Sequence, residues 1–276
     1  MRLAEEALPL RHAAALGLLQ GPSELLPISS SGHTALIPWL ADWPYAELDG
    51  ELQKAFEVAL HAGAGCALAI VMRRDLVREL GRLDGSRAAV LALSLAPPVL
   101  AGLTLRRPIE RHMGGPRSIA AGLLAGAVAM AIADARPGEG ARGCEQARAS
   151  DGLALGLAQA TALIPGVSRN GATLTAARWR GFDRGAAQAL SWNTALPVIL
   201  GASVLKGARL VRDGTPARTR AALAMGAGTS FVSTLISAGL LRRGSSRLRP
   251  LLPYALYRCL LAVLVMVRLR RTRGGR

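Results

Sequence analysis

Polar side chains of the kinds that handle phosphate occur in two short stretches of an otherwise apolar sequence. The first stretch carries Gln20 and Glu24, which are four residues apart and therefore share a helical face. It continues with Ser29, Ser30, Ser31 and His33, and the second stretch carries Ser168, Arg169, Asn170 and Thr173. Arginine binds phosphate through two parallel hydrogen bonds, a carboxylate can hold a divalent cation, and histidine or serine can transfer a proton or attack. Together these residues form a candidate site for phosphate chemistry.

The two stretches are copies of one another. The residues Leu16-Gly17-Leu18-x-Gln20 and Gly32-x-Thr34 recur 139 positions later as Leu155-Gly156-Leu157-x-Gln159 and Gly171-x-Thr173. Proline and glycine interrupt the apolar run in both copies. Interrupted segments at matching places in two halves are typical of a site near the midplane of an internally repeated membrane protein. The competing interpretation is chance similarity within sequence rich in Ala, Gly and Leu.

The composition favours a membrane protein. The chain has 276 residues, 51% of them hydrophobic, and a mean hydropathy of +0.29. Six apolar runs come close to or reach the roughly 17–25 residues that cross a bilayer, at about 56–72, 88–105, 118–133, 186–205, 221–241 and 251–267. The two polar-centred stretches, about 8–40 and 153–177, break midway and read as re-entrant helical hairpins. We predict an all-α integral membrane protein with about six transmembrane helices and two such hairpins.

The repeat predicts a single membrane domain made of two halves. They cover about 1–135 and 151–276, and a surface loop at 136–150, rich in Gly, Arg and Glu, joins them. Three full spans separate the two copies, and an odd number of spans turns the second copy upside down. In this inverted-topology arrangement the hairpins enter from opposite faces and their tips can meet.

The formal charge of +16 does not indicate a nucleic-acid-binding protein, because the arginines are spread between the apolar runs instead of forming one basic domain. Contact with anionic lipid headgroups explains that distribution. Nearly every loop is basic, so the positive-inside rule leaves the orientation open. The three cysteines are far apart and indicate neither a disulfide framework nor a zinc site, and we expect no cleaved targeting segment.

Several of these polar residues have structural interpretations as well. Serine and threonine beside proline and glycine are commonly helix caps or packing residues, so Ser29, Ser31 and Thr34 stay open between the two roles. Arg169 could simply neutralise Glu24 as an ion pair.

Residues outside the two stretches receive weaker assignments. Glu57 and His61, four residues apart, fit an interfacial helix end better than a supporting role at the site. Gly122 and Gly126 predict close helix packing. A lipid phosphatase of the acid-phosphatase type is disfavoured, because Thr175 stands six residues after Ser168-Arg169 where that family has a nucleophilic histidine.

The two stretches resemble the signature motifs of a known family. Gln20-x-x-x-Glu24-Leu-Leu-Pro27-Ile-Ser29-Ser30-Ser31-Gly32-His33 and Pro165-Gly166-x-Ser168-Arg169-x-Gly171-Ala172-Thr173 are similar to those of the bacterial undecaprenyl-diphosphate phosphatases of the bacitracin-resistance type. Similarity extends to Phe56-Glu57-Val58, Ala195-x-Pro197 and Tyr257-Arg258, and so covers nearly the whole chain. The resemblance implies a multi-pass enzyme of the bacterial inner membrane that hydrolyses the lipid carrier diphosphate to the monophosphate for cell-wall synthesis.

The resemblance also implies roles for individual residues. Catalysis would involve Glu24, Ser30, His33 and Arg169, and phosphate contacts would come from Ser168, Arg169 and Thr173. From their places in the two stretches we add Ser31 and Asn170 as further phosphate contacts. Glu24, with Gln20, would hold a divalent cation, Mg²⁺ or Ca²⁺. Asn170 stands where the family typically has serine, and Gln20 supplies no second charge; both departures bear on metal affinity and rate more than on reaction class.

Several alternatives stay open from the sequence. Spacing does not decide whether Ser30 attacks directly or His33 activates water. A lipid transporter or flippase also fits inverted repeats with broken helices, and a catalytically weak relative that only binds the lipid is a third interpretation. The resemblance places the active site toward the periplasm or cell exterior. The exact lipid and the oligomeric state, including a homodimer, are left undecided.

Overall fold

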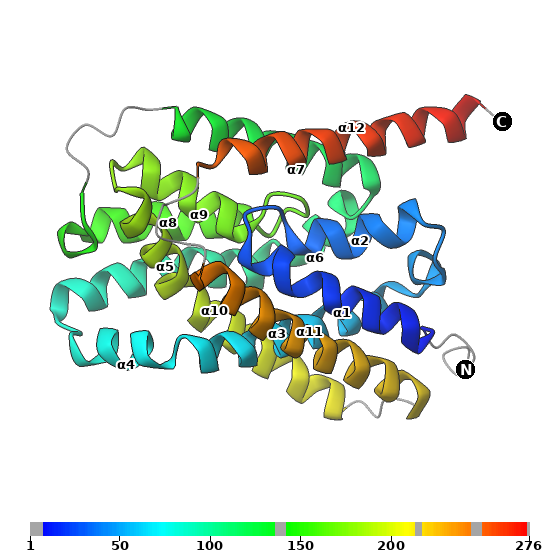
Figure 1. Ribbon diagram of the computed structural model, residues 1–276, viewed down its shortest axis with the longest axis horizontal. Helices are drawn as coiled ribbons and strands as arrows, with labels where there is room; N and C mark the ends of the chain where they lie inside the picture. The colour runs from blue at the N-terminus through cyan, green and yellow to red at the C-terminus, as the bar shows by residue number, and fades with distance from the viewer. Residues whose placement is uncertain (1–7, 136–141, 213–216, 244–249, 275–276) are drawn as a thin grey trace. The chain divides into compact units, whose positions relative to one another are not determined.

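The protein is mostly helical in the part that a computed structural model describes, which is residues 8–135, 142–212, 217–243 and 250–274 (Figure 1). Its elements are α1 (Leu10–Leu25), α2 (Ser30–Leu40), η1 (Pro44–Glu47), α3 (Gly50–Val71), α4 (Arg73–Gly81), α5 (Gly85–Thr104), α6 (Arg106–Met113), α7 (Pro116–Asp134), η2 (Cys144–Gln146), α8 (Ala149–Thr161), α9 (Arg169–Trp179), α10 (Arg184–Arg212), α11 (Ala217–Arg243) and α12 (Leu252–Gly274). These residues contain no β-strand beyond one isolated bridge between Arg142 and Phe182. The predicted all-α class is therefore confirmed.

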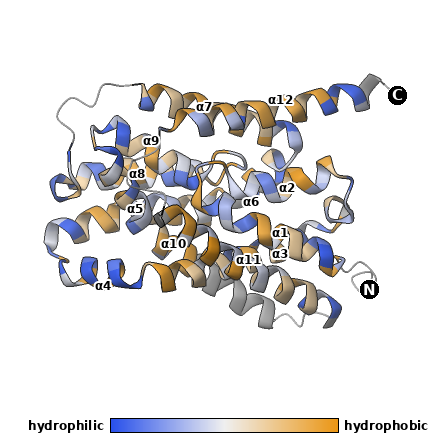
Figure 2. Ribbon diagram, viewed as in Figure 1, coloured by the Kyte–Doolittle hydropathy of each residue, from blue (hydrophilic) through white to orange (hydrophobic). Residues whose placement is uncertain are grey.

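Five of the described helices are long and apolar enough to cross a membrane, at Gly50–Val71, Gly85–Thr104, Pro116–Asp134, Arg218–Leu241 and Leu252–Thr272. They match five of the six predicted runs. The sixth, 186–205, falls within α10, where the side chains from 202 onward lie outside the described residues. Figure 2 shows α12 apolar along most of its length and hydrophilic toward its C-terminal end, as a span ending at the headgroup level would be. The chain is an integral, multi-pass membrane protein.

Both polar-centred stretches form pairs of short helices separated by a break. The helices α1 and α2 have 16 and 11 residues, and α8 and α9 have 13 and 11. At a rise of 1.5 Å per residue, these helices are about 17–24 Å long, less than the roughly 30 Å of a bilayer core. The predicted breaks are thus present, while re-entrant placement in a membrane stays a prediction.

The described chain groups into two compact units, and each combines helices from both predicted halves. Unit 1 contains Met1–Leu25, His33–Arg73 and Val198–Gly244, and unit 2 contains Leu26–Gly32, Arg74–Pro197 and Ser245–Arg276. The tip of the first hairpin thus groups with the second hairpin. Whether the whole forms one domain of two halves, and how 136–141 of the predicted connecting loop is arranged, lies outside what the described residues show.

Helices related by the 139-residue offset pack in corresponding ways inside each unit. In unit 1, α1 packs along α11; in unit 2, α8 packs along α5. A Cβ added at Gly17 on α1 would lie 2.6 Å from the carbonyl oxygen of Gly226 on α11. A Cβ at the matching Gly156 on α8 would lie 2.8 Å from Cδ of Pro97 on α5. Both sites need glycine because the neighbouring helix is this close, which is a common way for membrane helices to associate.

Polar side chains connect these packed helices in each unit. In unit 1, Ser230 of α11 donates a hydrogen bond to the carbonyl oxygen of Leu60 on α3 at 2.7 Å. In unit 2, Nε2 of Gln159 on α8 donates to the carbonyl oxygen of Ser94 on α5 at 3.0 Å. Figure 1 shows α7 and α12 side by side, and this pair forms another contact inside unit 2. Within unit 2, α5 packs on α8 and α7 packs on α9, so these two helices support the second hairpin.

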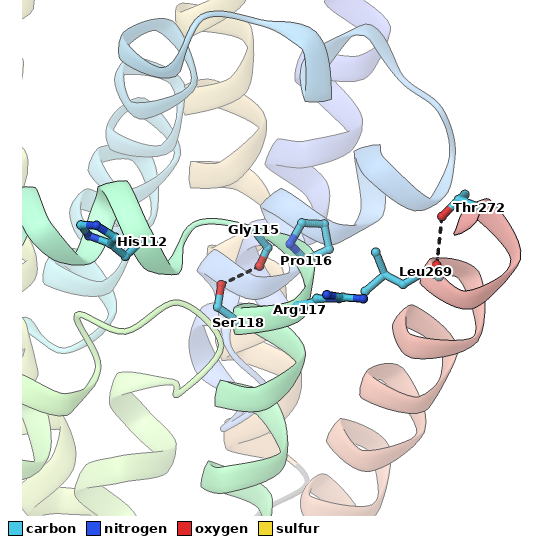
Figure 3. A pocket seen from close by; sticks show the side chains of 7 residues that line it. All are labelled: His112, Gly115, Pro116, Arg117, Ser118, Leu269 and Thr272. Carbon is cyan, nitrogen blue, oxygen red and sulfur yellow. Dashed lines mark hydrogen bonds between the residues drawn. The ribbon is translucent and has the colours of Figure 1, made fainter. Parts of the chain in front are cut away.

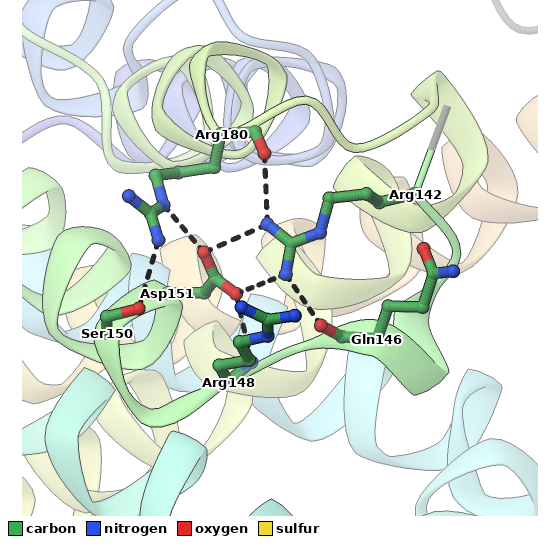
Figure 4. A network of polar contacts seen from close by, with 6 residues as sticks. All are labelled: Arg142, Gln146, Arg148, Ser150, Asp151 and Arg180. Carbon is green, nitrogen blue, oxygen red and sulfur yellow. Dashed lines mark hydrogen bonds and ion pairs between the residues drawn. The ribbon is translucent and has the colours of Figure 1, made fainter. Parts of the chain in front are cut away.

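A buried carboxylate, Asp151, fixes the open end of the second hairpin (Figure 4). Its side chain is 0% exposed and accepts hydrogen bonds from Nη2 of Arg142 at 2.7 Å, Nε of Arg180 at 2.6 Å and the backbone N–H of Arg148 at 2.9 Å. Burial would raise the pKa of the carboxyl group, but the hydrogen bonds from these partners outweigh it and lower the pKa from its usual value. Arg142 also lies over the Phe182 ring at 4.3 Å. These contacts link α8, the end of α9 and the segment before η2.

Candidate functional site

In each hairpin, one serine in an unusual backbone conformation directly precedes the second helix. Ser29 has φ 78° and Ser168 has φ 67°, a region that non-glycine residues rarely occupy. The Ser29 hydroxyl accepts the Gly32 N–H at 3.3 Å, and the Ser168 hydroxyl accepts the Gly171 N–H at 3.2 Å. Both serines are therefore N-caps, which answers the question left open for Ser29. The same local geometry recurs at positions 139 apart, and each capped helix start is a favourable place for an anion.

The two hairpin tips meet inside unit 2, and Arg258 of α12 joins them. Its Nη1 donates to the carbonyl oxygen of Pro27 in the first tip at 3.4 Å, and its Nη2 donates to those of Gly166 and Val167 in the second tip at 2.8 and 3.0 Å. A Cβ added at Gly32 would lie 3.6 Å from Cα of Gly166. The predicted meeting of the tips is confirmed for these residues.

Helix α7 leaves room for this arrangement at two glycines. A Cβ on Gly122 would lie 2.5 Å from the carbonyl oxygen of Pro165, and a Cβ on Gly126 would lie 2.8 Å from Cζ of Arg258. The carbonyl oxygen of Gly122 accepts a further hydrogen bond from Arg258 at 3.3 Å. The predicted close packing at these glycines is confirmed. The group that packs against Gly122 is the second tip, and the group that packs against Gly126 is the guanidinium of Arg258.

A buried carboxylate and two neighbours form the polar cluster of unit 1. Nε2 of Gln20 donates to Oε2 of Glu24 at 3.2 Å, and the same oxygen lies 3.5 Å from Nε2 of His61 on α3. His61 Nδ1 lies 2.8 Å from the carbonyl oxygen of Glu57, so this nitrogen carries the hydrogen and Nε2 faces the carboxylate. The interpretation of His61 as a helix end is wrong, because His61 lies in the middle of α3 (Gly50–Val71) and its ring faces the predicted catalytic carboxylate.

The remaining predicted residues of the first hairpin lie at the start of α2. Ser30 and Ser31 are half-buried, and His33 and Thr34 are buried, with exposed fractions of 1% and 0%. The chain connects these residues to Glu24 through the first tip. A shared pocket for Glu24 and Arg169 stays a prediction, because the two residues belong to different units.

In the second hairpin, Asn170 and Thr173 are bound to Ser191 of α10. Ser191 donates to Oδ1 of Asn170 at 2.9 Å, and its oxygen lies 2.6 Å from the Thr173 hydroxyl. Thr173 is fully buried and also contacts the carbonyl oxygen of Arg169 at 3.0 Å. Asn170, which stands where the family typically has serine, is thus held by Ser191. A phosphate contact by Thr173 stays a prediction.

Two residues of these clusters, Arg258 and His61, received too little weight from the sequence, although the sequence contained an indication for each. Arg258 is a charged residue inside an apolar run, where an ionisable group is expensive and usually has a function. His61 lies one helical turn after Glu57 in the first predicted span. What sequence spacing cannot provide is the partner, since Arg258 contacts carbonyl groups 92 and 231 positions away in the chain.

A separate hollow of about 470 Å³ lies between the α6–α7 turn and the end of α12 (Figure 3). It is lined by His112, Gly115, Pro116, Arg117, Ser118, Leu269 and Thr272. None of these residues belongs to either tip. The hollow lies at the ends of two candidate spans, α7 and α12, and is distinct from the predicted site.

The cluster around Glu24 partly suits a divalent cation. Oε1 of Gln20 is buried without a hydrogen-bond partner, four residues from the Glu24 carboxylate. The described residues contain no group of three or more His, Cys, Asp or Glu side chains arranged to hold a metal ion. Mg²⁺ typically binds one or two carboxylates and completes its shell with water and substrate phosphates. Gln20 and Glu24 fit that pattern, with most ligands supplied from outside the protein.

Fold and site define a class of protein: a helical integral membrane protein whose two broken helices meet at serine-capped tips joined by an arginine. The chain belongs to the bacitracin resistance protein BacA family, which it matches over residues 13–264. It is 40% identical over 263 residues to the undecaprenyl-diphosphatase of Geobacter sulfurreducens, covering 91% of this chain and 95% of that protein. Identity to the undecaprenyl-diphosphatase of Thermomicrobium roseum is 37% over 254 residues, covering 84% and 88%.

Proposed function

We propose that this protein hydrolyses undecaprenyl diphosphate to undecaprenyl phosphate and inorganic phosphate, and so recycles the lipid carrier of cell-wall synthesis. The observation that carries the proposal is the pair of capped helix starts held together at the tips. Each presents the positive end of a helix dipole, and the second adds Arg169 directly after its cap. Family membership and relatives named undecaprenyl-diphosphatases support the same activity.

The tips bind the diphosphate in this proposal. Arg169 holds phosphate oxygens through its two-pronged guanidinium, and Ser30, Ser31, Ser168 and Asn170 add hydrogen-bond donors. Charge that develops on the transferred phosphoryl group is stabilised by donors that are already oriented, because both tips are fixed by their caps and by Arg258. Attack on the terminal phosphorus, by water or by the Ser30 hydroxyl, breaks its bond to the bridging oxygen, and undecaprenyl phosphate leaves. Water then supplies the oxygen of the released inorganic phosphate, directly or by hydrolysis of the serine phosphate.

Proton transfer falls to the cluster around Glu24 and to His33. Oε2 of Glu24 and Nε2 of His61 are 3.5 Å apart. A proton passes between them in this proposal after a small approach or through one water molecule. His33, the only histidine in either hairpin tip, is the second candidate. Ser30 as a nucleophile and a water activated by His33 remain the two routes. A Mg²⁺ or Ca²⁺ ion held by Glu24 and Gln20 would neutralise charge on the diphosphate.

The surroundings of the enzyme are part of the proposal. We place it in the bacterial inner membrane with the site open to the periplasm or cell exterior. Anionic lipids would contact basic segments such as α4, where Arg74 and Arg78 accompany the exposed apolar side chains of Val77 and Leu80. Association of two copies as a homodimer would be tested by the mass of the protein in micelles.

Product analysis in detergent micelles tests the function. Purified protein should convert undecaprenyl diphosphate to undecaprenyl phosphate and inorganic phosphate in a one-to-one ratio, with a response to added Mg²⁺ or Ca²⁺ and its loss on chelation. Micelles have no leaflets, so a flippase would leave the substrate intact. Binding of the lipid without phosphate release would indicate the catalytically weak relative and contradict the proposal.

A further inference from the structure

We infer that Arg258 is a positioning residue for the proposed hydrolysis: its buried guanidinium sets the geometry of both tips and adds positive charge behind them. The inference rests on the proposed function for its kinetic part only. Arg258 is 0% exposed and is the largest fully buried side chain of the described protein. It therefore does not touch the substrate, and any effect on the reaction passes through the residues it holds.

The hydrogen bonds of Arg258 reach both tips at once. Nη1 binds the first tip at Pro27 and Nη2 binds the second tip at Gly166 and Val167. The side chain thus links two backbone segments that are far apart in the sequence. Removing the guanidinium leaves these three carbonyl oxygens of the tips, and that of Gly122 on α7, without this donor.

The orientation of these carbonyl groups has a consequence for the candidate site. The C=O and N–H of a trans peptide point in opposite directions. Since the Val167 carbonyl group points at Arg258, the N–H of Ser168, the N-cap of α9, points away from Arg258. Arg258 therefore helps to set the orientation of the backbone at the start of α9, where the proposal puts the phosphate.

Among the described residues, no carboxylate forms an ion pair with Arg258. All the hydrogen bonds that it donates within the described chain go to neutral acceptors, four backbone carbonyl groups and the sulfur of Met130. Its Nε is buried without a partner. A cation buried in this way creates a positive potential that extends to its surroundings, because little water is present to screen it. A diphosphate at the tips would benefit from that potential.

Substitution separates the two contributions. Arg258→Lys keeps the charge but loses the fork that reaches both tips, whereas Arg258→Met loses both. We expect the turnover number for undecaprenyl diphosphate to fall about 100-fold or more in Arg258→Met, as misplacement of a site by about 1 Å can produce. The inhibition constant of inorganic phosphate should rise roughly tenfold in Arg258→Met and stay within about threefold of wild type in Arg258→Lys. Arg117→Met, which removes an exposed arginine of α7, is the matched control and should change neither quantity.

Hydrogen exchange provides a readout that does not depend on activity. Amides of residues 26–32 and 165–171 should exchange faster in Arg258→Lys, while those of α3 and α11 keep wild-type rates. If wild-type protein released no phosphate, the proposed function would fail. Hydrogen-exchange rates at the tips would still show whether Arg258 positions them. Wild-type turnover, phosphate inhibition and tip exchange in folded Arg258→Met protein would overturn the inference. If Arg258→Met does not fold, wild-type turnover and tip exchange in Arg258→Lys would overturn it equally.

Discussion

Replacing Gly126 by alanine should displace Arg258 without removing it. The added Cβ would lie 2.8 Å from Cζ and 3.0 Å from Nη1 of the guanidinium, and closer still to Nη2. Ordinary contacts between carbon atoms begin near 3.5 Å, so the guanidinium must move by about 0.7 Å or more. Its four carbonyl contacts surround it, and a movement of that size lengthens or breaks part of the set.

The magnitude follows from three contributions. Loss of one or two hydrogen bonds from a charged donor costs about 1.5–3 kcal/mol each, and overpacking in a filled core costs about 1–3 kcal/mol. Alanine offsets about 1 kcal/mol of this through its higher helix propensity. We therefore expect Gly126→Ala to lower the free energy of unfolding by about 3–5 kcal/mol.

Gly102→Ala is the matched control, because a Cβ at this helical glycine meets no atom within 4 Å. It should stabilise the protein by up to about 1 kcal/mol. Unfolding of both variants in micelles, driven by sodium dodecyl sulfate and followed by circular dichroism, gives the comparison, and phosphate release reports on the site. Equal stability and equal activity of the two variants would refute the packing argument at Gly126.

Three further outcomes are expected. Hydrogen bonds lower the pKa of Asp151 in the folded state. The contribution of Asp151 to stability is therefore present above its unfolded pKa of about 3.9 and is lost as pH falls through the folded pKa. Asp151→Asn should remove this acid-dependent loss of stability from melting curves measured below about pH 4. Glu24→Gln and Arg169→Lys should each reduce phosphate release about 100-fold or more, whereas Ser29→Ala should mainly reduce stability, by about 1 kcal/mol. His33→Gln should abolish one limb of the pH–rate profile together with most of the turnover.

Each of these outcomes has a result that contradicts it. Unchanged acid sensitivity in Asp151→Asn would show that other carboxyl groups control unfolding. Similar activity losses in Glu24→Gln and Ser29→Ala, at equal folded fractions, would remove the distinction between site and cap. A wild-type pH profile in folded His33→Gln would make His33 structural, leaving proton transfer to Glu24 or to water on a metal ion.

Local pattern was enough to predict most of the long apolar helices and the breaks in the two hairpins, but not the short polar helices α4 and α6. Runs of apolar residues gave five spans that the structure contains, and the proline and glycine near residues 27 and 166 marked both tips. The repeat predicted that the tips could meet. Caps such as Ser29 were recognised only as one of two options, because the sequence shows a serine before a helix but not its φ angle.

Long-range partners could not be predicted in the same way. Arg142 and Arg180 surround Asp151 from positions 9 and 29 residues away, in a segment expected to be a surface loop and at the end of a helix. His61 reaches Glu24 from another helix, and Arg258 reaches carbonyl groups, which have no signature in a sequence. Tertiary packing decides these contacts. The sequence pattern shows only that a charged residue lies in an apolar run, not which groups it contacts.

The central claim, that both tips form one site, is tested most directly by phosphate release from undecaprenyl diphosphate. The proteins to compare are wild type, Ser30→Ala, Arg169→Lys and the double variant. If both tips act on one phosphoryl group, wild-type protein releases phosphate, each single variant loses most of its turnover, and the double variant is much less impaired than the product of the two single losses. Absence of phosphate release by wild-type protein, or independent multiplicative losses at the two positions, would contradict a single site built from both tips.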